Sequence, residues 1–185
     1  MQLAFFFDQT RCIGCYTCAV ACKDWHDVPA GPASWLRVIT IEQGRYPEPF
    51  LAYLISACYH CDVPACVAAC PMNAISKREQ DGIVIVDSNK CVGRDACQLC
   101  LQVCPYGAPQ FGIEENAFMQ KCDFCSERWL MGKRPVCVDS CPARALDAGP
   151  LDEMRTRYGE ATEAAGFTYN YEVRPSIVFK PKLRT

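Results

Sequence analysis

Cysteine spacing is the feature of this sequence from which chemistry can be inferred. The 185 residues include 16 Cys, which fall into four groups of four with none left over. Every group ends in C-x3-C, and Pro directly follows the last Cys in three of them. The groups are Cys12, Cys15, Cys18 and Cys22; Cys58, Cys61, Cys66 and Cys70; Cys91, Cys97, Cys100 and Cys104; and Cys122, Cys125, Cys137 and Cys141.

This spacing is typical of ligands for iron–sulfur clusters. In the bacterial ferredoxin run C-x2-C-x2-C-x3-C-P, three thiolates hold one cluster and the fourth ligates its neighbour. The short steps wrap a loop so that three sulfurs converge and backbone N–H groups face the cluster. The x3 step carries the chain through a helical turn, and the Pro that follows has no N–H to donate. We therefore expect all 16 Cys to be cluster ligands.

Disulfides and structural zinc are the two other common uses of so many cysteines. Disulfide frameworks belong to secreted domains, and the segment from Met1 to Asp8 has no basic stretch ahead of an apolar one. Zinc sites with four thiolates also use C-x2-C pairs, but they need no C-x3-C-P. Both alternatives stay open on the sequence, and the spacing favours clusters over either.

Composition bears on several other classes of function. The chain has 19 Lys+Arg against 21 Asp+Glu and a formal net charge of −2, so nucleic-acid binding is not expected. The longest apolar stretch, Phe50 to Cys58, is far shorter than the ~20 residues of a spanning helix. We expect neither a membrane span nor an export signal. We also expect no catalytic residue, because no Ser/His/Asp set, phosphate-binding Gly loop or supported carboxylate pair is present.

An internal repeat surrounds the Cys groups. Asp8-Gln-Thr-Arg-Cys12 matches Asp87-Ser-Asn-Lys-Cys91, and an apolar run precedes each. The pattern C-P-x-x-A recurs at Cys70–Ala74, Cys104–Ala108 and Cys141–Ala145. A strand, a cluster loop, a short helix and a second loop therefore recur. This predicts an α+β fold of duplicated ferredoxin-like, two-cluster modules, which is loop-rich and stabilised by its clusters.

The elements that must position the cysteines are short. We expect strands, from their β-branched and aromatic residues, at Leu3–Phe7, Leu36–Glu42, Leu51–Ser56, Ile83–Asp87 and Ser176–Lys180. We expect helices at Ala19–His26, Ala65–Ala69, Leu99–Val103 and Leu151–Tyr158. The prediction is one compact body over 1–185 with three parts: a two-cluster module of 1–30 plus 115–150, a second of 51–114, and a C-terminal helix and strand in 151–185.

The order of the four groups and three phrases resemble a known family. The phrases are Cys104-Pro-Tyr-Gly-Ala-Pro109, Met119-Gln-Lys-Cys-Asp-Phe-Cys125 and Cys141-Pro-Ala-Arg-Ala-Leu-Asp147. They resemble the electron-transfer subunit of the dimethyl sulfoxide reductase family of molybdopterin oxidoreductases, from about Phe6 to Lys180. The resemblance implies a non-catalytic subunit with four [4Fe–4S] clusters in a complex of anaerobic respiration. It would relay single electrons between a quinone-linked or other redox partner and a catalytic subunit with a Mo or W bis-pterin cofactor.

The resemblance also implies partners and a location. The catalytic subunit is large, and a quinone-reactive membrane-anchor subunit is often the third member. The chain would be membrane-associated through these partners, either cytoplasmic or exported as a folded complex with a signal-bearing partner. Two alternatives from other classes remain, namely a free-standing polyferredoxin shuttle for a hydrogenase or formate dehydrogenase and a non-redox accessory protein that holds metal.

The sharing of ligands is implied by the resemblance as well, and it agrees with the ferredoxin rule that the fourth Cys serves the neighbouring cluster. The first and fourth groups pair, as do the second and third. The implied sets are Cys12, Cys15, Cys18 with Cys141; Cys122, Cys125, Cys137 with Cys22; Cys58, Cys61, Cys66 with Cys104; and Cys97, Cys100, Cys70 with Cys91.

The last of these sets departs from the family pattern. The third group usually starts C-x2-C, but this chain has Cys91-Val-Gly-Arg-Asp-Ala-Cys97. Either Arg94 replaces a Cys or three residues are inserted. Because Cys91 survives, we expect a [4Fe–4S] cluster with a longer loop; if Cys91 lies too far away, the cluster is [3Fe–4S]. The Arg94 charge or additional N–H groups are expected to raise its reduction potential.

Other residues near the Cys groups invite a functional interpretation. His26 and His60 are expected at the surface or around the clusters without ligating iron, because thiolates already fill the sites. Lys121 has three open interpretations: a charge that screens a cluster, a contact to a partner, or a solvated side chain. Five aromatic residues are expected to form a water-excluding shell rather than an electron relay: Tyr59, Tyr106, Phe111, Phe124 and Trp129.

Overall fold

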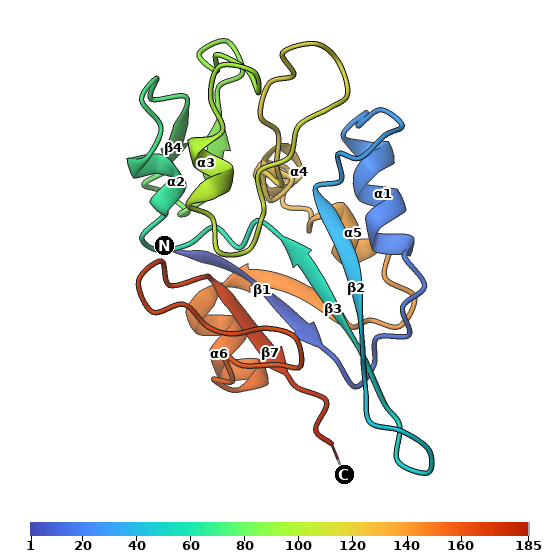
Figure 1. Cartoon of the computed structure of the whole chain (residues 1–185). Helices are drawn as coiled ribbons and strands as arrows, with labels where there is room; N and C mark the ends of the chain where they lie inside the picture. The colour runs from blue at the N-terminus through green and yellow to red at the C-terminus, as the bar shows by residue number, and fades with distance from the viewer. Residues whose placement is uncertain (185) are drawn as a thin grey trace.

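The computed structural model describes residues 1–184, and Figure 1 shows how its elements are arranged. The strands are β1 Leu3–Asp8, β2 Leu36–Gln43, β3 Phe50–Ala57, β4 Ile75–Lys77, β5 Val84–Val86, β6 Leu146–Pro150 and β7 Ile177–Lys180. The helices are α1 Thr17–Trp25, α2 Ala65–Ala68, α3 Leu99–Gln102, α4 Ser126–Leu130, α5 Val136–Asp139 and α6 Leu151–Tyr158. Each expected strand and helix is present, and β4, β6, α4 and α5 are additional. The mixed α and β class is confirmed.

A three-stranded sheet in the order β6-β1-β7 forms the base of the molecule. β1 pairs with β6 antiparallel and with β7 parallel, and all its residues are buried. Its side chains alternate between the two faces, as a strand requires. Ala4 and Phe6 pack against α6, whereas Leu3, Phe5 and Phe7 belong to the main core that also holds cysteines. One face of the sheet therefore packs against the cysteine loops.

Two smaller sheets flank the cysteine loops. β2 and β3 form an antiparallel hairpin, and β3 ends at Ala57, directly before the second Cys group. Val38 of β2 and Ile55 of β3 line a cavity that four Cys of the first and fourth groups also line. β4 and β5 form the other antiparallel pair. The hairpin thus supplies apolar side chains to the first cysteine loop; Figure 1 shows β2 and β3 side by side.

The β1–β6 and β4–β5 pairs share one register relative to the cysteines. In both pairs, the residue five positions before the first Cys of one group is opposite the residue five positions after the last Cys of another group. The Cys are Cys12 and Cys141 for the first pair, and Cys91 and Cys70 for the second. The backbone N–H of Asp8 donates to the carbonyl of Ala145, and that of Asp87 donates to Ala74, both at 2.8 Å. The opposed residues are Phe7 and Leu146 in the first pair, and Val86 and Ile75 in the second.

The short helices pack in two pairs. α1 contacts α5, and α2 contacts α3; the two pairs lie on opposite sides of α4 in Figure 1. The C-x3-C step runs through a helical turn in every group, as predicted, since Cys66, Cys100 and Cys137 lie in α2, α3 and α5. None of the helices within residues 1–184 combines the length and the apolar composition that a membrane span requires.

Gly14 offers a test of how tightly the first cysteine loop is packed. It has φ +67°, and a Cβ at this position would overlap the ring of Tyr53. Gly132 is a matched control, because it has φ +71° and nothing within 4 Å of a Cβ. Both Ala variants incur the left-handed backbone cost of about 1–2 kcal/mol, but only Gly14→Ala must also displace Tyr53.

We expect Gly14→Ala to lower the melting temperature more than Gly132→Ala does, measured by circular dichroism on the metal-loaded protein. We also expect it to lose about four irons per chain, one cluster's complement, while Gly132→Ala keeps its full iron content. Equal effects of the two substitutions would show that the contact with Tyr53 is unimportant.

Candidate metal centre

The structure gathers the 16 Cys, all free thiols, into four sites. Site I is Cys12, Cys15, Cys18 and Cys141, which line one cavity. Site II is Cys22, Cys122, Cys125 and Cys137, and site III is Cys58, Cys61, Cys66 and Cys104. Burial, and next the charges of neighbouring thiolates, raise the pKa of Cys122 and Cys137 in site II and of Cys61 in site III. Site IV is Cys70, Cys91, Cys97 and Cys100, which line a second cavity. These are the four sets that the family resemblance implies; that each of them binds iron stays a prediction.

Helices connect the sites in pairs. A helical turn brings two Cys that are four residues apart to the same face, and the two then belong to different sites. Two helices connect sites I and II, through the pairs Cys18/Cys22 of α1 and Cys137/Cys141 at α5. Two others connect sites III and IV, through Cys66/Cys70 at α2 and Cys100/Cys104 at α3. Cys58 and Cys122 are close enough for the charge of one to raise the pKa of the other, so sites II and III adjoin. The order is I–II–III–IV.

The recurring C-P-x-x-A pattern acquires a physical meaning in the structure. In each copy the Ala N–H donates to the Cys sulfur four residues earlier, at 3.3–3.4 Å. The residue before the Ala is left-handed in every case, and it is Asn73, Gly107 or Arg144. The pattern is therefore a turn that directs a backbone N–H at a sulfur, an interaction that strengthens when the sulfur carries charge.

Site II, which contains none of these three Cys, has a different turn that also directs backbone N–H groups at sulfurs. The N–H of Phe124 donates to Sγ of Cys122 at 3.4 Å, and the N–H of Val136 donates to Sγ of Cys125 at 3.5 Å. Phe124 and Cys125 are both left-handed, at φ 62° and 48°, which is uncommon for residues other than Gly. The carboxylate of Asp123 accepts the N–H of Cys125 at 2.8 Å and so stabilises this turn.

Burial sets the acid–base chemistry of the thiols. It raises the pKa of Cys18 and Cys22 to about 12 and that of Cys100 to about 11. Thiols bind metal as thiolates, so metal binding at these sites must displace protons. Cys15 differs, because it is exposed and a hydrogen bond with the Thr17 hydroxyl lowers its pKa. Site I therefore reaches the protein surface.

His60 adds an independent sign that a sulfur-rich group belongs in this interior. The side chain is 1% exposed, and its Nδ1 accepts the N–H of Val84 at 3.0 Å, so the proton of the neutral ring lies on Nε2. Within residues 1–184 that Nε2 has no hydrogen-bond partner. A buried donor without an acceptor is costly. Sulfide and thiolate sulfurs are acceptors, and four converging soft thiolates suit iron–sulfur clusters, so the residues fit the group.

The longer loop of site IV still brings Cys91 to its partners. Cys91 lines the same cavity as Cys97 and Cys100. The guanidinium of Arg94 donates to the carbonyl of Gly112 at 2.9 Å and lies 3.5 Å from a carboxylate oxygen of Asp95. Arg94 thus anchors the additional residues, and Asp95 offsets part of its charge. That Arg94 raises the reduction potential stays a prediction.

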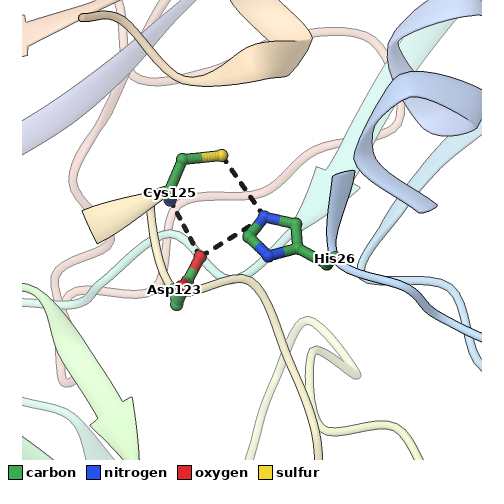
Figure 2. A group of neighbouring side chains, drawn as sticks. All are labelled: His26, Asp123 and Cys125. Carbon is green, nitrogen blue, oxygen red and sulfur yellow. Dashed lines mark hydrogen bonds and ion pairs between the residues drawn. The ribbon is translucent and has the colours of Figure 1, made fainter. Parts of the chain in front are cut away.

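His26 lies beside a ligand sulfur of site II, as Figure 2 shows. Its Nε2 is 3.3 Å from Sγ of Cys125 and 3.6 Å from Oδ1 of Asp123, and its ring packs on Trp35 at 4.4 Å. Burial lowers the pKa of His26, against the opposing effect of the Asp123 charge. These three residues are close enough to hold a metal ion of their own. However, Cys125 belongs to site II, and a coordinated thiolate can only accept, so we assign Nε2 as a donor to Cys125.

Burial decides between the alternatives that the sequence left open for Lys121 and His60. Lys121 is 3% exposed, which excludes the solvated interpretation, and His60 is not at the surface. No sequence signal marks either residue apart from its position beside a Cys. The aromatic residues act in packing: Phe124 is fully buried and lies 4.5 Å from Phe5 between ring centroids, and Phe111 lines site IV.

Comparisons with known proteins agree with this chemistry. A family model described as a 4Fe-4S dicluster domain matches residues 49–151. The B chain of anaerobic dimethyl sulfoxide reductase from Escherichia coli (strain K12) is 43% identical over 188 residues, which cover 97% of this chain and 89% of that protein. The B subunit of sulfite dehydrogenase from Allochromatium vinosum is 32% identical over 200 residues, covering 97% and 80% of the two proteins. A putative dimethyl sulfoxide reductase iron-sulfur protein, the B subunit from Halobacterium salinarum, is 38% identical over 175 residues, covering 79% and 65%.

The hydrogen bond from His26 to Cys125 predicts a change in one reduction potential. A donor to a ligand sulfur stabilises the more negative reduced cluster. We expect His26→Phe, which keeps a ring against Trp35, to lower the midpoint potential of one cluster and leave the other three unchanged in an EPR-monitored redox titration. His26→Gln, which retains an N–H donor, should shift that potential less. Four unchanged potentials in His26→Phe would contradict the assignment.

Proposed function

The chain belongs to the family of the iron–sulfur B chains of dimethyl sulfoxide reductases, and on that premise we propose that sites I to IV hold four [4Fe–4S] clusters. The chain is the electron-transfer subunit of an oxidoreductase complex, and bound clusters supply one-electron redox chemistry. The observation that carries the assignment of sites is the joining of four sets of four thiols into two pairs by shared helices, with Cys58 and Cys122 adjoining between the pairs. The part of the polypeptide is to hold, space and insulate these groups.

The two ends of the row suit contacts with two different partners. At site I Ile13 and Tyr16 are 65% and 47% exposed and line the cavity, and Cys15 itself is exposed. At site IV Met72 and Leu99 are 47% and 42% exposed, and both line the cavity of that site. Exposed apolar groups beside a functional site are typical of protein contacts. Site II is shielded, because all four of its Cys are buried, and sites I and IV stand at the ends of the row, so electrons enter and leave through these two sites.

One of these partners is a catalytic subunit, as the names of the relatives imply. We propose that it bears a Mo or W bis-pterin cofactor, and that a quinone-reactive membrane-anchor subunit is the other partner. The chain then lies at a membrane through its partners, on the cytoplasmic side or, by co-export with a signal-bearing partner, on the opposite side. One relative is named as part of a reductase and another as part of a dehydrogenase. These names support electron flow toward the catalytic subunit in the first and away from it in the second, through subunits of the same fold.

The fold is proposed to be a duplication of two ferredoxin-like modules. Residues 1–30 with 115–150 would form the first, around sites I and II, and 51–114 the second, around sites III and IV. The common register of β1–β6 and β4–β5 and the equivalent hydrogen bonds of Asp8 and Asp87 support this proposal. Residues 151–185 would be a C-terminal addition, of which α6 and β7 cover the sheet of the first module.

Native anaerobic purification tests the proposed function. We expect a large chain to co-purify with this one, in a complex that contains iron together with Mo or W by metal analysis, and whose clusters are reversibly reduced. Purification of the chain alone with reducible clusters would favour a free shuttle instead. A zinc-loaded chain, or one without reversible reduction, would make it a metal-holding accessory protein.

Cys91→Ser tests the cluster type at site IV. If Cys91 is the fourth ligand, its loss frees one iron, and we expect the EPR signal of an oxidised three-iron cluster to replace one [4Fe–4S] signal. The other three clusters should keep their signals. Ser88→Ala, at an exposed position of the same loop, is the control and should leave all four clusters intact. A Cys91→Ser spectrum identical to that of the wild type would exclude Cys91 as a ligand.

A further inference from the structure

Lys121 is a buried cation without a carboxylate partner. Its side chain is 3% exposed, and its Nζ donates to the carbonyls of Val84 and Cys122, the latter at 3.0 Å. None of the ion pairs formed by residues 1–184 includes it. Two neutral carbonyls do not offset the cost of removing an ammonium group from water. Negative charge from another source is therefore needed nearby.

The position of Lys121 is where sites II and III meet. It directly precedes Cys122 of site II in the sequence. On the other side Val84 joins it to His60, which lies between Cys58 and Cys61 of site III in the sequence. Burial and Cys58 raise the pKa of the Cys66 thiol of that site, and the Lys121 charge opposes this rise. Cys58 and Cys122 adjoin each other. The ammonium group thus lies between the backbone of site II and the thiols of site III.

His60 lies next to Lys121 but adds no positive charge. Val84 holds both side chains, because its N–H donates to Nδ1 of His60 and its carbonyl accepts from Lys121. Because Nδ1 of His60 accepts this N–H, it carries no proton, and the ring is neutral. His60 contributes a donor, and Lys121 contributes the charge.

We propose that Lys121 is a fixed counter-charge shared by the two inner clusters, which raises the reduction potentials of both. The inference rests on the proposed occupancy of sites II and III by clusters. Four thiolates make each loaded site anionic, and each reduction adds one more negative charge. A buried ammonium between the sites stabilises the reduced form of both clusters, because little water is present to screen it. The anionic clusters in turn compensate the burial of the ammonium.

Lys90 provides a matched control on the same chain. It directly precedes Cys91 of site IV, as Lys121 precedes Cys122 of site II. Its side chain is 59% exposed and pairs with Asp87 at 3.3 Å, so water and a carboxylate screen its charge. Lys90→Met and Lys121→Met thus remove the same group from the same sequence position relative to a Cys, once at the surface and once in the interior.

The experiment is an EPR-monitored redox titration of the purified complex for the wild type and both variants. We expect Lys121→Met to lower two of the four midpoint potentials and to leave the other two, those of sites I and IV, in place. Lys90→Met should leave all four unchanged. Four unchanged potentials in a fully iron-loaded Lys121→Met complex would overturn the proposal, because Lys121 would then serve only as a hydrogen-bond donor.

Lys121→Gln keeps the test decisive if the Met variant loses iron. The amide retains donors for the two carbonyls but carries no charge, so the same two downward shifts are expected. Selective loss of the two inner clusters from Lys121→Gln also supports a need for the charge, whereas loss of all four counts against it. A wild-type complex without four reducible clusters refutes the proposed function itself, which distinguishes that failure from failure of the proposal on Lys121.

Discussion

The structure depends on one constraint, which is that two cysteines one helical turn apart belong to different sites. Cys18 and Cys22 of α1 illustrate it, since the first faces site I and the second faces site II. The distance between neighbouring sites is then set by the geometry of a helix rather than by flexible loops. This occurs at four helices, which join site I to site II and site III to site IV. The adjoining Cys58 and Cys122 connect the two pairs into one row. Helices of four residues, such as α2, α3 and α5, are not stable alone. Bound metal is therefore part of the fold.

A second theme is how the interior accommodates sulfur that becomes charged on metal binding. The chain has a net charge of only −2, yet it commits 16 thiols to four largely buried sites. The compensating groups are mostly donors on the backbone, which the C-P-x-x-A turns direct at sulfurs. Side chains add to them at the inner sites, where His26 faces Cys125 and Lys121 lies between sites II and III. Every site has backbone donors, so these donors do not distinguish one cluster from another. Differences between the reduction potentials of the four clusters therefore depend on the side chains.

The ligand sets that the family resemblance implies stay a prediction, whereas the local structure of each Cys group follows directly from its spacing. A C-x3-C step followed by Pro specifies one helical turn that ends near the Pro, and this local structure does not depend on the rest of the fold. Strands with β-branched or aromatic residues, such as β1 and β3, are predicted for a similar reason. Two of the additional elements have sequences that favour other structures: α5 contains a C-x3-C step but reads Val-Cys-Val-Asp, which is typical of a strand, and β6 contains Gly149 and Pro150.

Burial of single polar residues was beyond prediction from the sequence. Lys121 and His60 are adjacent to cysteines, but whether such a residue faces water depends on which distant segments cover it. Here β5 covers both, through the N–H and the carbonyl of Val84. The parallel pairing of β7 with β1 is equally non-local, because it joins segments near the two ends of the sequence. Both features arise from tertiary packing, for which the residues concerned carry no local pattern.

The central claim is that every cysteine is committed to one row of four clusters, and a count of iron and acid-labile sulfide per chain tests it most directly. The measurement is made on anaerobically purified material, with protein quantified by amino-acid analysis. The account predicts about sixteen irons and an equal number of sulfides per chain, together with the brown colour of iron–sulfur proteins. Colourless protein, or fewer than about a dozen irons per chain, would contradict it.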